Sequence, residues 1–405
     1  MKHHLLCVLL AGTLCLAGRT VASAADAADW PSFRGSPDMR GVAQSELPAK
    51  PELLWTHEAG SKILSSAAIA GDSVYVGTEH GEVLSLALAD GKLRWKFDAS
   101  EPISASPCVV NGAVYIGDEG GIFHALDAAT GKELWHFDTK DKIISSATPA
   151  PGVILFGSYD YHLYCLDAKT GAKRWAFKTD SFVHCSPCVA GDVAMIAGCD
   201  GLVRFISIAS GRQVTAQKVE GNFAACPAFD REAALVGDMS GRFFRVPLLA
   251  TAAAWRFEDE DGGGAYAGAA LSDNSVIFAS RASKVFSCDR KTGRILWTAA
   301  TKGPVNSSPV IVPQAGDDGP RVFFGSDDGT LHALRLKDGK VTWNFAAGAP
   351  ITASPAVAHG RLVIGTEDGA ICCFGAKDKI PPPPRVVVPR IREQESAPPA
   401  ESNKP

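Results

Sequence analysis

The 405-residue sequence has few methionines, only 4, and no long apolar run beyond its N-terminus. It also lacks a basic excess, because 40 Lys and Arg stand against 44 Asp and Glu, giving a net charge of −4. Phosphate binding needs clustered cations, so this charge argues against nucleic acid as a partner. Without a second apolar run we expect no membrane-spanning helix. Glycine is abundant, with 40 residues, which is typical of a globular chain with many tight turns.

The first residues have the pattern of an export signal. Leu5 to Gly18 is apolar, and Ala22-Ser23-Ala24 is a small-x-small cleavage site. The apolar run is too short to cross a bilayer of about 30 Å as a helix. We therefore expect residues 1–24 to be a cleaved signal peptide and the mature protein to be periplasmic or secreted. A leucine precedes both Cys7 and Cys15, which argues against a lipid anchor.

The rest of the chain is dominated by one repeat. Its tryptophans recur every 40 residues at first, and then at longer gaps where a copy lacks its Trp or holds an insertion: Trp55, Trp95, Trp135, Trp175, Trp255, Trp297 and Trp343. Each copy holds four short β-branched and aromatic runs, which in the second copy are Ile103–Pro107, Ala113–Gly117, Gly121–Asp127 and Thr130–Phe137. Four strands in each copy, repeated along the chain, predict a β-propeller.

A second motif gives the number of blades. An apolar residue followed by small residues recurs eight times, at Ile63, Ile103, Ile143, Val183, Phe223, Tyr266, Val305 and Ile351. The last copy stops at Ala376 without its Trp strand, and a spare strand around Trp55 precedes the first copy. We therefore expect an all-β, eight-bladed propeller of four-stranded antiparallel blades, the last closed by the N-terminal strand. The expected boundaries are an N-terminal segment at 25–50, the propeller at 51–378 and a Pro-rich disordered tail at 379–405.

The run Ala-Leu-Asp-Ala-Ala-Thr-Gly-Lys-Glu-Leu-Trp ending at Trp135 resembles the pyrroloquinoline quinone (PQQ) repeat, and copies end at Trp175 and Trp297. The Trp-Pro-Ser-Phe-Arg-Gly that starts at Trp30 is similar to the opening of exported proteins of this superfamily. The resemblance implies eight blades, with the seven repeated tryptophans docking neighbouring blades. It covers two branches: quinone-dependent alcohol dehydrogenases, and BamB-like propellers, which are non-enzymatic scaffolds for assembling outer-membrane barrels.

The residues expected to line the channel favour the scaffold branch. A quinone dehydrogenase needs a Ca²⁺ site with oxygen ligands and a carboxylate base, and none of the eight motifs contains Asp or Glu, although one has Asn306. The dehydrogenases also carry bridged adjacent cysteines. Here Cys372 and Cys373 are neighbours in an expected strand and point to opposite faces, so we interpret both as packing residues. We expect no catalytic, cofactor-binding or metal residues, and PQQ with Ca²⁺ in a PQQ-dependent dehydrogenase stays the alternative.

Another cysteine and histidine group lies in the fourth and fifth copies. Cys185 and Cys188 form a C-x-x-C spacing, and Cys226 takes the position of Ser186 in the next copy. A disulfide from Cys226 to either one is compatible with an exported protein, and free buried thiols are the alternative. His184 is expected near the channel, but one His/Cys pair is weak support for zinc, which takes four ligands.

Acidic residues gather in the turns between the second and third strands: Glu79, Asp118, Glu119, Asp160, Asp200, Asp238, Asp327, Asp328, Glu367 and Asp368. The turns between the third and fourth strands carry Lys92, Lys132, Lys173, Arg212, Arg294 and Lys340. Antiparallel order places these two sets on opposite faces, so we predict one acidic and one more basic face. Asp also favours turns for purely structural reasons.

These features give one functional hypothesis with two alternatives. We expect a monomeric, non-catalytic scaffold whose acidic face docks a cationic partner among exported or envelope proteins. Reversing Asp118, Asp200 and Asp327 to Lys is expected to abolish this docking. The alternatives are a PQQ-dependent oxidoreductase and an extracellular propeller that binds a ligand or polymer.

Overall fold

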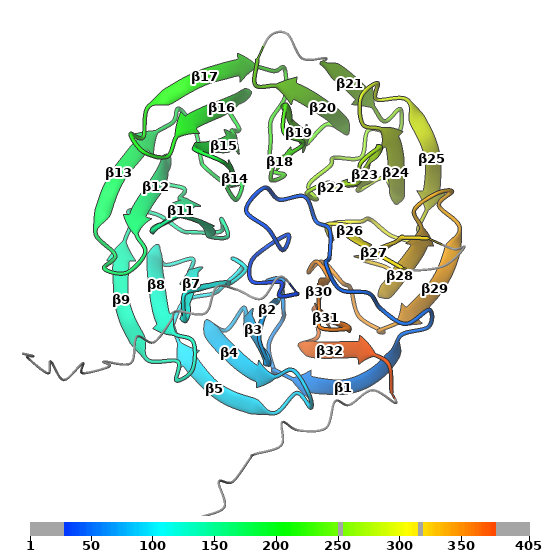
Figure 1. Ribbon diagram of the computed structural model, residues 1–405, viewed down its shortest axis with the longest axis horizontal. Coiled ribbons are helices and arrows are strands. Elements are labelled where there is room, and N and C mark those ends of the chain that lie inside the picture. The colour runs from blue at the N-terminus through cyan, green and yellow to red at the C-terminus, as the bar shows by residue number, and fades with distance from the viewer. Residues whose placement is uncertain (1–27, 250–253, 315–318, 378–405) are drawn as a thin grey trace, which may run out of the picture.

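The computed structural model describes residues 28–249, 254–314 and 319–377, which form thirty-two strands and no helix. The strands make eight four-stranded antiparallel sheets around one axis (Figure 1), which confirms the predicted eight-bladed β-propeller. The expected signal peptide and Pro-rich tail lie outside the described residues. Within the described ranges, no helix has the length and hydropathy needed to cross a membrane.

In each of the first four blades, consecutive strands run from the axis outward. Blade 1 has β2 (Ala68–Ala70), β3 (Ser73–Gly77), β4 (Glu82–Ala87) and β5 (Leu93–Asp98). Blade 2 has β6 (Cys108–Val110), β7 (Ala113–Gly117), β8 (Ile122–Asp127) and β9 (Glu133–Asp138). Blade 3 has β10 (Thr148–Ala150), β11 (Val153–Gly157), β12 (His162–Asp167) and β13 (Lys173–Lys178). Blade 4 has β14 (Cys188–Ala190), β15 (Val193–Ala197), β16 (Leu202–Ser207) and β17 (Gln213–Lys218).

Blades 5 to 7 repeat this order, and blade 8 takes its outer strand from the start of the chain. Blade 5 has β18 (Ala228–Phe229), β19 (Ala233–Gly237), β20 (Arg242–Pro247) and β21 (Trp255–Glu258). Blade 6 has β22 (Ala270–Leu271), β23 (Ser275–Ser280), β24 (Lys284–Asp289) and β25 (Ile295–Ala300). Blade 7 has β26 (Val310–Val312), β27 (Arg321–Gly325), β28 (Thr330–Arg335) and β29 (Val341–Ala346). Blade 8 has β30 (Ala356–Ala358), β31 (Arg361–Gly365), β32 (Ala370–Gly375) and β1 (Glu52–Glu58).

The pairing of β1 with β32 closes the ring. It runs antiparallel from Glu52 opposite Gly375 to Glu58 opposite Ala370, with a β-bulge between Leu53 and Trp55. Without β1, blade 8 would expose the edge of β32 as a row of unpaired backbone groups. The predicted closure by an N-terminal strand is therefore confirmed.

The innermost strands are shorter than the motif suggested. In blade 2 the motif Ile103–Pro107 lies before β6, which begins only at Cys108. The N–H of Ser106 donates to Ser146 Oγ of the next blade at 2.9 Å, and Pro107 has no N–H to give to a ladder. The motif residues therefore line the channel as extended chain and connect blades, instead of extending their own sheet.

The hydrophobic core lies between blades. Aromatic rings from adjacent blades stack with centroids 3.9 Å apart for Phe123 and Phe156, and 4.1 Å for Phe243 and Phe278. Such pairs contribute about 0.5–1.5 kcal/mol beyond the burial of their area. A blade is apolar on both faces, so it needs a neighbour on each side, and the ring supplies both.

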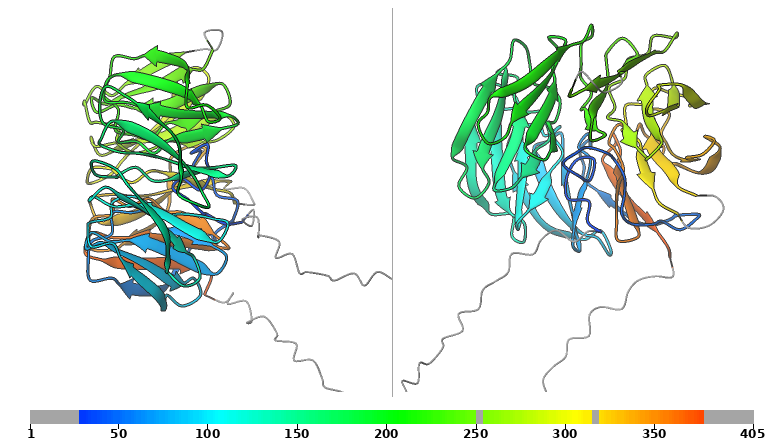
Figure 2. Two further views of the ribbon diagram at one scale, coloured as in Figure 1. Left: turned by 90° about the vertical axis from the view of Figure 1, so that its left-hand side faces the viewer. Right: turned by 45° about the horizontal axis from the view of Figure 1, so that its top comes forward.

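The chain from Trp30 to Lys50 crosses one end of the channel (Figures 1 and 2). Its carbonyls accept backbone N–H groups from inner strands of several blades: Pro31 from Val109, Pro37 from Val189, Asp38 from Phe229, Arg40 from Leu271 and Gly41 from Ile311. Its end is fixed by the buried Arg321, which donates to the carbonyls of Leu47, Pro48 and Ala49. We call this side of the disc the segment face and the opposite side the open face.

Candidate functional site

A ring of inter-blade hydrogen bonds surrounds the channel. The N–H of one blade donates to the side chain of the next, for example from Ser66 to Ser106 Oγ at 3.0 Å and from Ser354 to Ser66 Oγ at 2.9 Å. We call this set the hydroxyl ring: Ser66, Ser106, Ser146, Ser186, Cys226, Ser308 and Ser354. Gly268 takes the eighth position and brings no side chain.

A cavity of about 170 Å³ extends from Phe33 of the N-terminal segment, past the hydroxyl ring, toward the open face. Beyond the ring it is lined by Leu64, Ser104, Ile144, His184, Ala224, Tyr266, Asn306 and Thr352. These eight residues occupy the second position of the motif, which explains their circular arrangement. In the sixth copy the motif therefore begins at Ala265, and the predicted start at Tyr266 is wrong by one residue. The motif residues hold no carboxylate, as expected, and the wall is a mixture of hydroxyl, amide and apolar groups.

Two carboxylates nevertheless reach the mouth of this cavity from the turns between the second and third strands. Ser104 Oγ donates to Glu119 Oε1 at 2.5 Å, and Asn306 Nδ2 donates to Asp327 Oδ2 at 3.0 Å. The expectation of a lining without acid side chains therefore holds for the motifs, but it is wrong for the mouth. Each carboxylate is held by its own blade.

The ten acidic residues predicted to form one face divide into two groups. Asp118 and Asp238 are fully buried, and each accepts the N–H four residues ahead in its own hairpin, Ile122 and Arg242 respectively. Asp160, Asp200 and Asp328 are nearly buried and bind groups within their own blades. Asp368 is exposed but accepts from Thr366. As Asp118 and Asp200 bind within their blades, they are unsuitable for a test of docking.

The other four acids are partly exposed and come from four consecutive blades. We call this set the acidic arc: Asp327, Glu367, Glu79 and Glu119. They share the second position of the turn, which places Glu119 and Asp327 over the channel mouth. Lysines of the neighbouring loops lie on the same face, since Lys62 Nζ is 3.8 Å from Glu79 Oε2. The open face is therefore mixed in charge, and its acid is concentrated at the inner rim.

In the next three blades the same turn position carries aromatic or apolar residues. Tyr159 stacks on Phe182 with ring centroids 4.7 Å apart, and Tyr161 lies 5.2 Å from Phe182. Tyr161, Phe182 and Met239 are among the exposed large hydrophobic residues. We call Tyr159, Tyr161, Phe182 and Met239 the aromatic arc. Together the two arcs occupy most of the channel rim.

His184 lies in the aromatic part of the rim. Its Nδ1 is 2.6 Å from the hydroxyl of Tyr159, and burial, aided by nearby Lys142, lowers the pKa of His184. At neutral pH the ring is therefore uncharged. Cys185 lies behind it, fully buried, with its sulfur accepting the N–H of Ala197. The expected proximity of this pair to the channel holds for His184 only.

The described chain has nine cysteines, all free: Cys108, Cys165, Cys185, Cys188, Cys199, Cys226, Cys288, Cys372 and Cys373. The structure therefore contains no disulfide from Cys226 to Cys185 or Cys188. Cys372 and Cys373 are both buried in β32 and unbridged. Burial raises the pKa of Cys108 and Cys165 to about 12, so these thiols are protonated at neutral pH.

The repeated tryptophans pack against the next blade. The ring of Trp95 covers Gly131 in the turn between β8 and β9, and its indole N–H donates to the carbonyl of Ala128 at 3.0 Å. The same glycine contact is made by Trp55, Trp135, Trp175, Trp255 and Trp297. Trp343 differs because blade 8 receives β1 as its outer strand and has no such turn, so it packs edge-on against Phe374.

A quinone with Ca²⁺ requires a set of oxygen ligands gathered at one point. In the part of the chain that the structure describes, no three His, Cys, Asp or Glu side chains come together in a way that could hold a metal ion. Glu119 and Asp327 belong to blades 2 and 7 and are each bonded to their own blade. The two carboxylates therefore do not gather at one point with a third such side chain in the described part of the chain.

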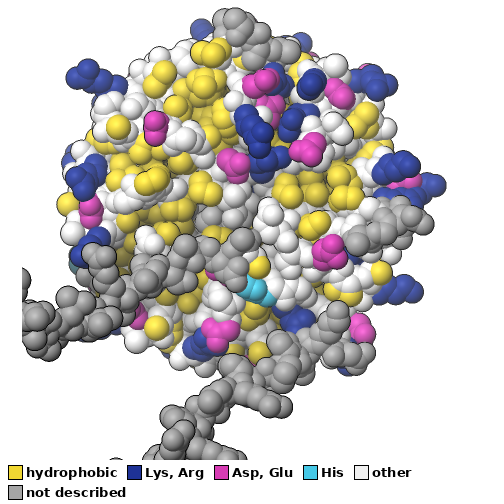
Figure 3. Space-filling model, in the orientation of Figure 1, with side chains coloured by type: hydrophobic (Ala, Val, Ile, Leu, Met, Phe, Trp, Pro, Cys, Tyr) yellow, Lys and Arg dark blue, Asp and Glu magenta, His cyan; other side chains and the backbone are white. Residues whose placement is uncertain are grey.

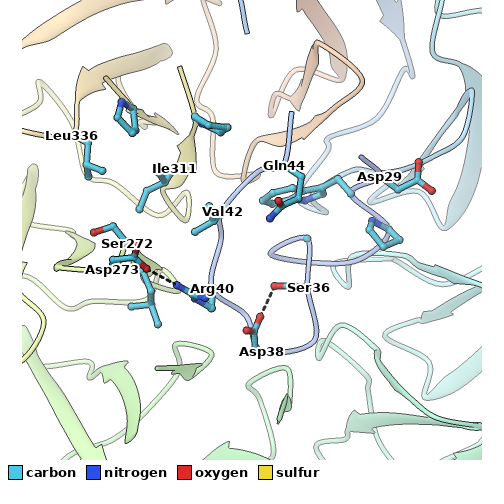
Figure 4. A pocket seen from close by; sticks show the side chains of 16 residues that line it. Asp29, Ser36, Asp38, Arg40, Val42, Gln44, Ser272, Asp273, Ile311 and Leu336 are labelled. Atoms are coloured by element: carbon cyan, nitrogen blue, oxygen red, sulfur yellow. Dashed lines mark hydrogen bonds and ion pairs between the residues drawn. The ribbon is translucent and has the colours of Figure 1, made fainter. Parts of the chain in front are cut away.

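The segment face has its own hollows. A pocket of about 520 Å³ lies between the N-terminal segment and blades 6 and 7 (Figure 4), where Arg40 and Asp273 are 4.0 Å apart and Ser36 donates to Asp38. Apolar side chains gather beside the segment on this face, and Lys and Arg stand around its rim (Figure 3). Asp29 binds His359 outside the pocket, and Arg40 Nε is buried without a hydrogen-bond partner.

Sequence reasoning missed Arg34, which is 1% exposed and lies at the closed end of the channel. Its Nη2 donates to the carbonyl of Ala269 at 2.7 Å. A single basic residue between Phe33 and Gly35 carries no periodic signal, so the only hint was its place within the Trp-Pro-Ser-Phe-Arg-Gly motif.

These features define a propeller of PQQ-like repeats with a narrow, hydroxyl-lined channel. Matches to the family described as outer membrane protein assembly factor BamB cover residues 47–158, 124–249, 248–315 and 311–380. The chain therefore belongs to this family. No curated protein sequence matches the chain.

Solved structures share the fold at low identity. BamB from Moraxella catarrhalis is 18% identical with a TM-score of 0.70, covering 80% of this chain and 100% of that one. Quinohemoprotein alcohol dehydrogenase from Comamonas testosteroni is 14% identical with a TM-score of 0.73, covering 90% and 82%. The computationally designed Ika8 protein is 17% identical with a TM-score of 0.66, covering 80% and 100%. Such identities establish the fold alone.

Proposed function

We propose that this protein is an exported, monomeric and non-catalytic scaffold that binds envelope proteins during outer-membrane protein assembly. Membership of the BamB family supports the assignment, and the expected signal peptide supports the location. The observation that carries it is the composition of the open-face rim, where the acidic arc and the aromatic arc lie side by side around the channel mouth. The N-terminal segment covers the opposite end of the channel.

The two arcs suit a partner segment with basic and apolar residues. Acid side chains from four consecutive blades attract a cationic segment and increase the rate of encounter. Exposed Tyr161, Phe182 and Met239 then supply apolar contacts, and aromatic residues dominate binding energy in many interfaces. The four acids are half-exposed, so binding a partner does not require the blades to open.

The docking test must spare the structural acids. Asp118 is buried beside His124, with Oδ2 3.1 Å from its Nε2, so a lysine there would damage the blade and its effect on binding would be uninformative. A suitable variant reverses Glu79, Asp327 and Glu367 to Lys on the open face. A matched control reverses Glu46, Asp192 and Asp273, exposed acids of the N-terminal segment and the segment face, with the same change in charge.

Affinity capture from an envelope extract distinguishes the two variants. We expect the wild type and the control variant to capture the same envelope proteins in equal amounts. The open-face variant should capture at least tenfold less of them. Equal capture by both variants would contradict docking at the acidic arc. Circular dichroism and thermal unfolding of each variant check that the propeller is intact.

A PQQ-dependent dehydrogenase is the second candidate, because Asn306 and Asp327 form a bonded pair at the channel mouth. Incubation with PQQ and Ca²⁺, followed by an absorption spectrum and a dye-reduction assay with alcohols, tests it. We expect no quinone-dependent reduction. Activity that disappears in Asp327→Asn would overturn the non-catalytic part of the proposal.

A further inference from the structure

The fully buried Arg34 has no counter-ion. Its Nη2 binds one carbonyl, while Nε and Nη1 are buried without a hydrogen-bond partner. Among the residues that the structure describes, no carboxylate lies within ion-pair distance of it. Burial lowers the pKa of Arg34 to about 9, so it is still charged at pH 7. An uncompensated buried ion costs several kcal/mol, so this charge needs an explanation.

Arg34 lies at the gap in the hydroxyl ring. A Cβ on Gly268 would lie 3.4 Å from Arg34 Nε and 3.6 Å from Ser308 Oγ, so the guanidinium and this hydroxyl approach the same point of the wall. Gly41 also lacks a side chain where Nη2 passes. Cys226 lies on the other side of the gap. Burial raises the pKa of its thiol, and the nearby Arg34 charge opposes this rise. Ser308 and Cys226 both line the cavity.

The serines of the hydroxyl ring present further donors. Each of the six serine oxygens accepts an N–H from the preceding blade. In the described chain Ser186 hydrogen-bonds to Cys226 through its side chain, and the other five hydroxyl groups donate to no other protein atom, so their hydrogens are available to the cavity. Thr352 Oγ1, nearer the mouth, is buried and has no partner. The wall of the cavity therefore offers donors without a carboxylate among its lining residues, and the Arg34 guanidinium lies next to this wall, at Gly268.

We propose that the channel is a binding site for a small anion, an inorganic oxyanion or a short carboxylate, held by Arg34 and the serine hydroxyls. Charge-assisted hydrogen bonds from Nε and Nη1 would satisfy the donors that the protein leaves unpaired. A cavity of about 170 Å³ exceeds the roughly 10–15 Å³ that one water needs, and it is too small for a polypeptide segment. The anion enters from the open face, past Glu119 and Asp327, whose carboxylates are each bonded to their own blade, because Phe33 and the N-terminal segment close the other end.

Calorimetric titration and thermal unfolding with sodium sulfate, acetate and chloride test this site, at an ionic strength held constant with a bulky sulfonate buffer. We expect saturable binding of at least one of these anions to the wild type. Arg34→Met should weaken it at least tenfold. The control is Arg40→Met, which removes the same charge from the same segment but outside the channel, and it should bind as the wild type does.

The absence of saturable binding to the wild type would overturn the proposal, and so would equal affinity in Arg34→Met. If Arg34→Met does not fold, Thr352→Val carries the test, because valine keeps the shape and removes a hydroxyl that has no protein partner. We expect at least threefold weaker binding in Thr352→Val, and unchanged affinity in that variant would overturn the proposal. None of these outcomes depends on the scaffold function.

Discussion

The contact between Trp95 and Gly131 allows the docking of adjacent blades to be measured. Gly131 has φ of +73°, and a Cβ placed on it would lie 2.5 Å from Trp95 Cε3. Gly131→Ala therefore combines two costs. A left-handed conformation in a non-glycine residue costs about 1–2 kcal/mol. Forcing an extra carbon into packed surroundings costs about 1–3 kcal/mol, so the total destabilisation should be about 2–5 kcal/mol.

Gly112 supplies the matched control within the same blade. Its φ is +77°, but a Cβ there would meet no atom within 4 Å. Gly112→Ala should therefore cost only the conformational part, about 1–2 kcal/mol. The difference between the two variants isolates the contact with Trp95.

Urea unfolding, followed by tryptophan fluorescence and by far-UV circular dichroism, measures both variants, and coincident transitions justify the free energies. In a double variant with Trp95→Ala, the contact part of the Gly131→Ala penalty should disappear, which appears as non-additivity. Equal destabilisation by Gly131→Ala and Gly112→Ala would refute the reasoning that the indole closes tightly on this turn.

Three further predictions concern buried polar groups. Burial lowers the pKa of His124, but hydrogen bonds and charge from Asp118 and Glu133 outweigh burial, so the net pKa is raised. The resulting stabilisation is complete below the unfolded pKa of about 6.5 and is lost as pH rises through the folded pKa. The wild type should therefore unfold at a higher urea concentration than His124→Gln at pH 6, this difference should shrink by pH 9, and a constant difference would contradict the reasoning. Thiol titration of the protein without its first 24 residues, in guanidinium and without reductant, should find nine thiols, and fewer would reveal a disulfide. Arg321→Met should lower the free energy of unfolding by about 1.5–3 kcal/mol, because charge-assisted bonds from Arg321 hold three carbonyls of the N-terminal segment. The variant should also expose residues near Ala49 to proteolysis. Unchanged cleavage would show that other contacts fix the segment.

The blade count and ring closure could be predicted because each blade repeats the same local signals. Tryptophan spacing and eight copies of the channel motif fixed the number of blades, and the spare strand around Trp55 indicated the closure. The chemistry of the rim could not be predicted as well. Asp118 and Glu119 are neighbours in one turn, yet the first carboxylate folds back onto the N–H of Ile122 while the second faces Ser104. Composition alone does not distinguish these positions.

Long-range placement was the other limit. The path of the N-terminal segment depends on contacts with inner strands of six blades, so no local pattern could place Arg34 beside Gly268. That the guanidinium lies at the gap left by Gly268 is seen only in the folded structure.

The pairing of β1 with β32 joins the first strand to be synthesised with the last. The strand synthesised first must remain without its ladder partner until almost the last propeller residue has been made. Contacts between such distant parts of a chain slow folding and leave strand edges open to wrong pairings in the meantime. The nascent chain must therefore keep this early strand from pairing wrongly until synthesis is nearly complete. A truncation before Ala370 would leave the ring open, with an unpaired strand edge that favours aggregation.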